Sequence, residues 1–151
     1  MGDASPANAE SAGASMRTPG ILRRIAGMAY EALLLAALLF LSTYLFLLFG
    51  AALDDAVRRP LLQASALAVS GAYLIWLWTH GGQTLPMKTW RMRLIDAGGG
   101  PVSLKQAVLR YLLACVLIPL GGAAIIWALV DRDRQFLHDR LARTRLVMTA
   151  N

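Results

Sequence analysis

The sequence predicts an all-α membrane protein with three hydrophobic helical segments and one short extended turn in the connection between the second and the third. Of its 151 residues, 57% are hydrophobic and 16% are charged, with a mean hydropathy of +0.52. Soluble domains are roughly 45–50% apolar and about 25% charged. The uncharged stretches are also long enough to cross hydrocarbon, and the basic residues lie between them. The lipid bilayer is therefore the expected partner.

Charge and cysteine content argue against several other classes of protein. The net charge is +6, but the basic residues form no single soluble module, so we expect no nucleic acid partner. The single cysteine, Cys115, lies in an apolar stretch, and His80 and His138 do not complete a metal-ligand spacing with it. The sequence thus predicts no metal site and no cofactor.

The first 19 residues are rich in Ala, Ser, Gly, Asn and Pro without an apolar period, which predicts a disordered tail. Residues 25–53 follow with one charge, Glu31, and exceed the roughly 20 apolar residues that a spanning helix needs. They are predicted to be the first span. A cleaved signal peptide is disfavoured, because its apolar region has only about 7–15 residues. A polar turn over 54–60 is expected next, with Pro60 opening the following helix.

Residues 61–79 carry no charge and predict the second span. Aromatic residues gather at its far end as in an interfacial belt: Tyr73, Trp76 and Trp78. Small residues recur every four positions on one face: Ala64, Ala68 and Ala72. That face either packs closely against another helix or reflects only the abundance of alanine in this chain.

The connection over 80–106 is polar and basic. Within it, residues 92–96 predict a short extended piece and residues 97–101 a turn, because three glycines precede a proline. These glycines do not form a phosphate loop, since no Lys-Ser or Lys-Thr follows them. Three basic residues beside Trp90 are predicted to contact anionic lipid headgroups: Lys88, Arg91 and Arg93.

The third hydrophobic segment, 111–130, has 20 uncharged residues, but Pro119 and two following glycines interrupt it. It therefore either spans with a kink or turns back. A straight span divides the basic residues eight to seven, whereas a turn back divides them thirteen to two. The positive-inside rule places the N-terminus and the basic connection in the cytoplasm and leaves the C-terminal side open. The folded domain is expected over 20–147, with a tail at 148–151.

Three ordered motifs resemble the RDD family of small membrane proteins. The first is PGILRRIAGMAYE at 19–31, with an arginine at the helix start and an acid seven residues later. The second is GGQTLPMKTWRMRLIDAGGGPVSLKQAVLRYLL at 81–113, and the third is LHDRLARTRLV at 137–147. The resemblance implies an integral membrane protein, expected in a bacterial inner (plasma) membrane. It also implies transport of ions or small solutes, with cation/proton exchange proposed for some members.

Mapped onto the family pattern, Arg24 matches its arginine, Glu31 stands at its first aspartate and Asp139 matches an acid near the end. Glutamate in place of aspartate keeps the negative charge and lengthens the side chain by one methylene. Two further departures are Pro86 and Arg143, each where the family usually has glycine.

Glu31 is the residue on which the functional prediction depends. Because seven residues make nearly two helical turns, Arg24 and Glu31 should share one stripe of the first helix. An acid within a span is costly and usually pairs or lines a polar path. We expect Glu31 to face Arg110 or the 132–145 segment rather than lipid. Arg24, Glu31, Arg110 and Asp139 are accordingly the candidate transport residues, or a structural ion-pair group that locks the helices.

Two classes of function follow. A transporter built on so few helices needs a homo-oligomer or a larger membrane complex to enclose a path. A non-enzymatic adaptor or assembly subunit needs only a packed helical surface. An enzyme is not expected, because the His138–Asp139 pair has neither a nucleophile nor an oxyanion site in a recognisable motif.

Overall fold

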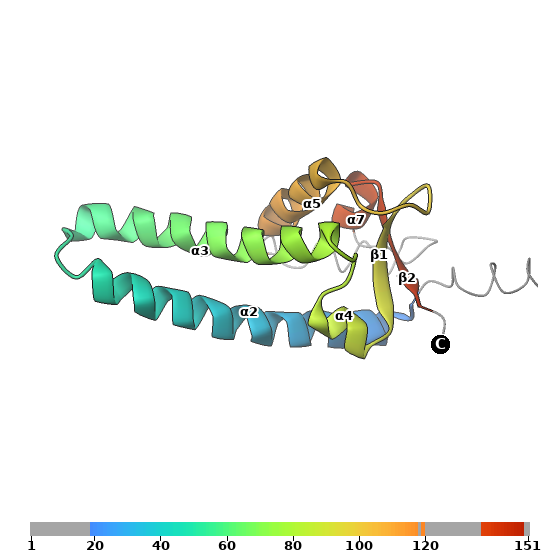
Figure 1. Cartoon of the computed structure of the whole chain (residues 1–151), viewed down its shortest axis with the longest axis horizontal. Coiled ribbons are helices and arrows are strands. Elements are labelled where there is room, and N and C mark those ends of the chain that lie inside the picture. Colours follow the sequence, from blue (N-terminus) through green and yellow to red (C-terminus); the bar gives the residue numbers. More distant parts are fainter. Residues whose placement is uncertain (1–18, 118, 120–136, 150–151) are drawn as a thin grey trace, which may run out of the picture.

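The computed structural model describes residues 19–117, 119 and 137–149. Two long helices, α2 (Ile21–Phe49) and α3 (Asp55–Thr79), form a hairpin. Five shorter elements gather where α2 begins and α3 ends, and we call them the cap (Figure 1). The cap consists of α4 (Leu85–Thr89), β1 (Met92–Asp96), α5 (Leu104–Leu117), α7 (Leu137–Leu141) and β2 (Thr144–Met148).

The hairpin helices are the two candidate membrane spans in the described part of the chain. They have 29 and 25 residues, so at 1.5 Å per residue each is about 40 Å long, more than the roughly 30 Å of hydrocarbon. The most hydrophobic window of α2 has no buried residues, and that of α3 is only 17% buried. Their apolar side chains therefore point outward, as they do in helices that face lipid.

The turn between the two helices lies earlier than the sequence predicts. The expected polar turn over 54–60 is wrong, because α3 already begins at Asp55. Gly50 ends α2, and its N–H donates to the carbonyl of Phe46 at 2.8 Å. Asp54 is extended at the N-cap, and the acid that follows it favours a helix N-terminus. Pro60 thus lies inside α3 instead of opening it.

The third segment is described only in part. Helix α5 has 14 residues, about 21 Å, which is too short to span by itself. The predicted kink or turn back over 118–130 lies outside the described residues, except that Pro119 is in a turn. The tail predicted at 1–19 is likewise undescribed up to residue 18. Among the described residues, two helices are candidate spans, and a third span is not confirmed.

The cap contains a two-stranded antiparallel sheet, where the sequence predicts one extended piece. Strand β1 occurs at 92–96 as expected, but β2 pairs with it in a register that runs from Met92↔Met148 to Asp96↔Thr144. The expectation of a single strand was wrong, and Met148, the first residue of the predicted tail, is the last residue of β2. An isolated strand leaves its backbone groups unpaired, and β2 supplies their partners. The strands run across the end of the hairpin (Figure 1).

This pairing also shows at which end of the hairpin the C-terminal segment lies. Residues 137–149 are at the same end as the 80–106 connection, because β2 is hydrogen-bonded to β1. The core of the cap lies beneath the sheet and joins it to α3 and α5. Its buried members are Leu74, Trp78, Met92, Leu94, Val102, Ala107, Tyr111 and Leu146.

Helix α5 packs against α3 at a glycine. The Tyr111 ring lies 3.0 Å from where a Cβ on Gly71 would stand, so a side chain there would require the ring to shift slightly. The Tyr111 hydroxyl also donates to the carbonyl of Leu67 at 2.8 Å. The close contact brings the neighbouring Arg110 against the end of α3.

Candidate functional site

The four ionisable residues singled out in the sequence line one cavity, of about 250 Å³, where the hairpin meets the cap. Arg24 and Glu31 come from α2, Arg110 from α5 and Asp139 from α7. Apolar side chains make up most of the remaining wall, among them Met28, Leu35, Leu74, Met87, Met92 and Leu146. Charged groups from three helices therefore meet in a largely apolar setting.

Arg110 and Asp139 form a buried ion pair. Nη2 and Nε of Arg110 lie 2.6 Å and 2.8 Å from Oδ1 of Asp139, and the two residues are 6% and 0% exposed. The guanidinium also lies over the ring of Trp78, with Cζ 4.3 Å from the centroid. The Thr144 hydroxyl donates to the backbone carbonyl of Asp139 at 3.2 Å. The pair thereby ties α3, α5, α7 and β2 together.

Arg24 joins α2 to the sheet. It is 1% exposed, and its Nη2 donates to the carbonyl of Leu146 in β2 at 3.5 Å. One turn later, Gly27 allows β1 to approach, since a Cβ there would lie 2.7 Å from the terminal carbon of Met92. Arg24 and Glu31 share one face of α2, as their spacing predicts.

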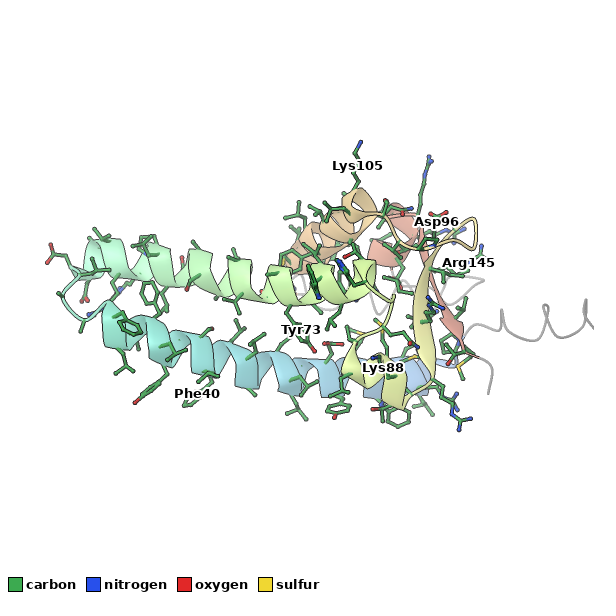
Figure 2. The ribbon with its side chains drawn as sticks, viewed as in Figure 1. Phe40, Tyr73, Lys88, Asp96, Lys105 and Arg145 are labelled. Carbon is green, nitrogen blue, oxygen red and sulfur yellow. The ribbon has the colours of Figure 1, made fainter. Side chains whose placement is uncertain are left out.

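The direct partner of Glu31 is a residue that the sequence analysis did not single out. The carboxylate accepts a hydrogen bond from the hydroxyl of Thr84, which is 0% exposed. The Tyr73 hydroxyl interacts with the same carboxylate, and Figure 2 shows the Tyr73 side chain reaching from α3 toward α2. Arg110 acts on the carboxylate electrostatically. In the described part of the chain, Oε1 of Glu31 is buried without a hydrogen-bond partner.

Glu31 and Arg110 line the same cavity, but the described residues show no salt bridge between them. Thr84 is held in place by α4, where it is the N-cap and accepts from the N–H of Met87 at 3.5 Å. Thr84 belongs to the Gly-Gln-Thr-Leu run at 82–85. Its position in this motif is the sequence feature that could have identified it, although it carries no charge.

The residues predicted to contact lipid headgroups are exposed on the cap. Lys88 lies in the last turn of α4, Arg91 lies between α4 and β1 with a φ of 53°, and Arg93 lies on β1. Figure 2 shows Lys88, Lys105 and Arg145 at this same end of the molecule. Ten of the twelve described lysines and arginines lie on the cap or on the adjoining start of α2: Arg23, Arg24, Lys88, Arg91, Arg93, Lys105, Arg110, Arg140, Arg143 and Arg145.

An acid at the end of β1 closes the glycine-rich turn. Asp96 accepts from the side chain of Gln106 and from the N–H of Gly98, the latter at 2.9 Å. These hydrogen bonds, led by that of Gln106, hold the pKa of Asp96 below its usual value. A lowered pKa means that the turn is stabilised above the ordinary pKa of aspartate and loses this contribution as the pH falls through the folded-state value.

The described residues contain no group of three or more His, Cys, Asp or Glu side chains that could hold a metal ion. The cavity presents charged groups and hydrogen-bonding groups to a ligand. Among the described residues, Oε1 of Glu31 has no hydrogen-bond partner and can accept a proton or a ligand, and the Arg110 guanidinium acts on this carboxylate electrostatically.

Comparison with known proteins places this arrangement in a family. The chain is similar to "Uncharacterized protein RP437" of Rickettsia prowazekii (strain Madrid E), with 34% identity over 88 residues, which are 58% of this chain and 49% of that protein. The chain thus matches about half the length of this relative. No solved structure matches it. The RDD family model matches residues 18–143, a range that includes Arg24, Glu31, Thr84, Arg110 and Asp139. With its two membrane-helix candidates, the chain is a membrane protein that belongs to the RDD family.

Proposed function

We propose that this protein moves an ion or a small solute across the membrane, and that Glu31 takes up and releases a proton in the process. The observation that carries the proposal is the setting of the Glu31 carboxylate. It belongs to a spanning helix, it lines the cavity, and its Oε1 is buried without a hydrogen-bond partner among the described residues. Placing an ionisable group inside the membrane costs free energy, and in membrane proteins such groups mark ion or proton pathways.

A path through the bilayer requires more than the described hairpin. The outward-facing apolar residues of α2 and α3 contact no other described segment over most of their length. We therefore propose that the protein works as a homo-oligomer or within a larger membrane complex. The exposed small-residue face of α3 suits such an assembly, because it allows close helix packing: Ala64, Ala68 and Ala72.

A second candidate function is that of a membrane adaptor or assembly subunit. The buried Arg110–Asp139 pair favours it, because a charged pair this well enclosed holds its helices together without having to move. In that case Glu31 and Thr84 also serve as a structural contact, and the protein acts through the surface of its hairpin.

For the orientation, we propose that the cap and the N-terminus lie in the cytoplasm, and that the membrane is a bacterial inner membrane. Ten of the twelve described basic residues lie at the cap end, whereas Arg58 and Arg59 lie near the hairpin turn. We also propose that Lys88, Arg91 and Arg93 contact anionic headgroups, each contributing about 1 kcal/mol near such a surface.

Cysteine labelling tests the orientation. In a Cys115→Ala background, Gly100→Cys reports on the cap and Ala52→Cys on the hairpin turn; a Cβ on Gly100 would meet nothing within 4 Å. A membrane-impermeant maleimide added to intact cells should modify Ala52→Cys and leave Gly100→Cys unmodified until the membrane is opened. The opposite pattern would place the cap outside.

The proton role is tested with Glu31→Gln in proteoliposomes that contain a pH-sensitive dye and carry Na⁺, K⁺ or chloride gradients. Glutamine can still accept from Thr84 but cannot ionise, so we expect flux to lose its pH dependence while the melting temperature stays close to that of the wild type. Asp55→Asn is the matched control, because Asp55 pairs with Arg58 and does not line the cavity.

The result that contradicts this role is a large fall in melting temperature with the pH dependence of flux retained, which would make Glu31 structural. A variant equal to the wild type in both measurements would also contradict it, since Glu31 would then only reach toward the headgroups.

A further inference from the structure

Two buried donors in the wall of the cavity have no hydrogen-bond partner in the described part of the chain. They are Nη1 of Arg110 and Nε1 of Trp78, and the two residues are 6% and 5% exposed. Asp139 occupies the other edge of the guanidinium, at Nε and Nη2. Oε1 of Glu31, an unpartnered acceptor in the same cavity wall, is not hydrogen-bonded to either donor. Because a buried donor without an acceptor is destabilising, a bound group with acceptor atoms would stabilise this pair.

The side chains that carry the two donors are in contact. The guanidinium carbon of Arg110 is 4.3 Å from the centroid of the Trp78 ring, and both residues line the same cavity. A single group with two acceptor oxygens, such as a carboxylate, could satisfy both at once. A cation cannot accept a hydrogen bond from these two N–H groups.

The charge of the cavity favours an anion when Glu31 is protonated. Among the described residues, the charged and titratable groups that face Glu31 are Arg24 on its own helix, Tyr73 on α3, Arg110 on α5 and Asp139 on α7. With Glu31 neutral, two guanidinium groups oppose one carboxylate in this described part of the wall. The net charge of one positive unit then attracts an anion into an apolar setting, where electrostatic interactions are strong.

The remaining wall suits an apolar body. Met28, Leu35, Leu74 and Met87 line the cavity, whose volume is about 250 Å³. An engineered apolar cavity of about 150 Å³ accommodates benzene, so this one has room for a charged head and several carbon atoms.

From these observations we propose that the cavity binds a small organic anion, a monocarboxylate with a short apolar chain. Its carboxylate accepts from Arg110 and Trp78, and its chain packs against the methionines and leucines. The inference rests on the proposed transport function, because it names the class of solute that would be carried together with the proton on Glu31.

Three probes with the same apolar body and different heads test this site: butyrate, 1-butanol and n-butylammonium. Calorimetric titration of the detergent-solubilised full chain at pH 6 should show butyrate binding, with the alcohol and the ammonium at least tenfold weaker. Equal binding of butyrate and butanol, or tighter binding of the ammonium, would overturn the proposal.

Two variants locate the binding. Trp78→Phe keeps an aromatic ring beneath Arg110 and removes the N–H, so butyrate affinity should fall about tenfold or more. Trp76→Phe is the matched control, because Trp76 is 63% exposed and does not line the cavity; its affinity should equal that of the wild type. Since Trp78→Phe could fail to fold, Ala114→Leu provides a second test by filling the cavity from α5, and it should abolish butyrate binding.

Wild-type butyrate affinity in either folded cavity variant would overturn the assignment to this cavity. The outcome also separates the two proposals. Butyrate binding without any flux would leave this site standing and contradict transport. Flux of Na⁺, K⁺ or chloride that depends on pH and on Glu31, with no butyrate binding, would support transport and overturn the organic-anion site.

Discussion

Asp139→Asn should lower the free energy of unfolding in detergent by about 3–5 kcal/mol. The substitution keeps the shape of the side chain but leaves the Arg110 guanidinium charged and 6% exposed, without the carboxylate that lies 2.6 Å away. The loss is large because the remaining charge has no access to water. Thermal and denaturant unfolding, followed by tryptophan fluorescence, would measure it, since Trp78 lies beside the guanidinium.

A matched control removes an acid from an exposed pair. Asp55 pairs with Arg58 at i,i+3 on the surface of α3, so Asp55→Asn should change the stability by less than about 1 kcal/mol. Replacing both buried partners, as Arg110→Met with Asp139→Leu, should recover much of the loss. If Asp139→Asn proved as stable as the control, the pair would not be shielded from solvent and would not lock the cap.

Gly82→Ala should destabilise the cap by about 2–5 kcal/mol. Gly82 has a φ of +67°, which costs roughly 1–2 kcal/mol for a residue with a Cβ. That Cβ would also stand 2.4 Å from the carbonyl oxygen of Leu94 in β1, and overpacking of this kind typically adds about 1–3 kcal/mol. The N–H of Leu94 donates to the carbonyl of Gly82 at 2.7 Å, so neither backbone can move without losing that bond. The melting temperature in detergent measures the effect.

The adjacent glycine is the control for this prediction. A Cβ on Gly81 would meet nothing within 4 Å, so Gly81→Ala should leave the melting temperature close to that of the wild type. Equal behaviour of the two alanine variants would contradict the close approach of Gly82 to β1. Because Thr84 follows two residues later, Gly82→Ala should also disturb the hydrogen bond to Glu31.

These two variants affect the site through different contacts. Asp139 holds Arg110, one of the two buried donors, and Gly82 holds the segment that carries Thr84 to Glu31. The site therefore depends on the cap, whereas the hairpin carries Glu31 to the place where the cap can reach it.

By itself, the sequence determined the properties that are local. The two hairpin helices follow from hydropathy and length, because a chain in hydrocarbon must satisfy its backbone within each helix. Strand β1 and the following turn follow from composition. The candidate residues Arg24, Glu31, Arg110 and Asp139 were found because charges in apolar surroundings are costly and therefore informative, and the ordered motifs pointed to the family.

Only the tertiary structure decided the relations between distant residues. Thr84 and Glu31 are 53 positions apart, and Arg110 and Asp139 are 29 apart, so no helical or strand period connects them. Strand β2 escaped prediction because a strand acquires its hydrogen bonds only from a partner elsewhere in the chain. Its pairing with β1 placed the C-terminal segment at the same end of the hairpin as the basic connection. The count of basic residues alone left that placement open. The helix boundary at Asp55 depended on the turn at Gly50 and Asp54, whose caps outweigh the preference of Pro60 for a helix start.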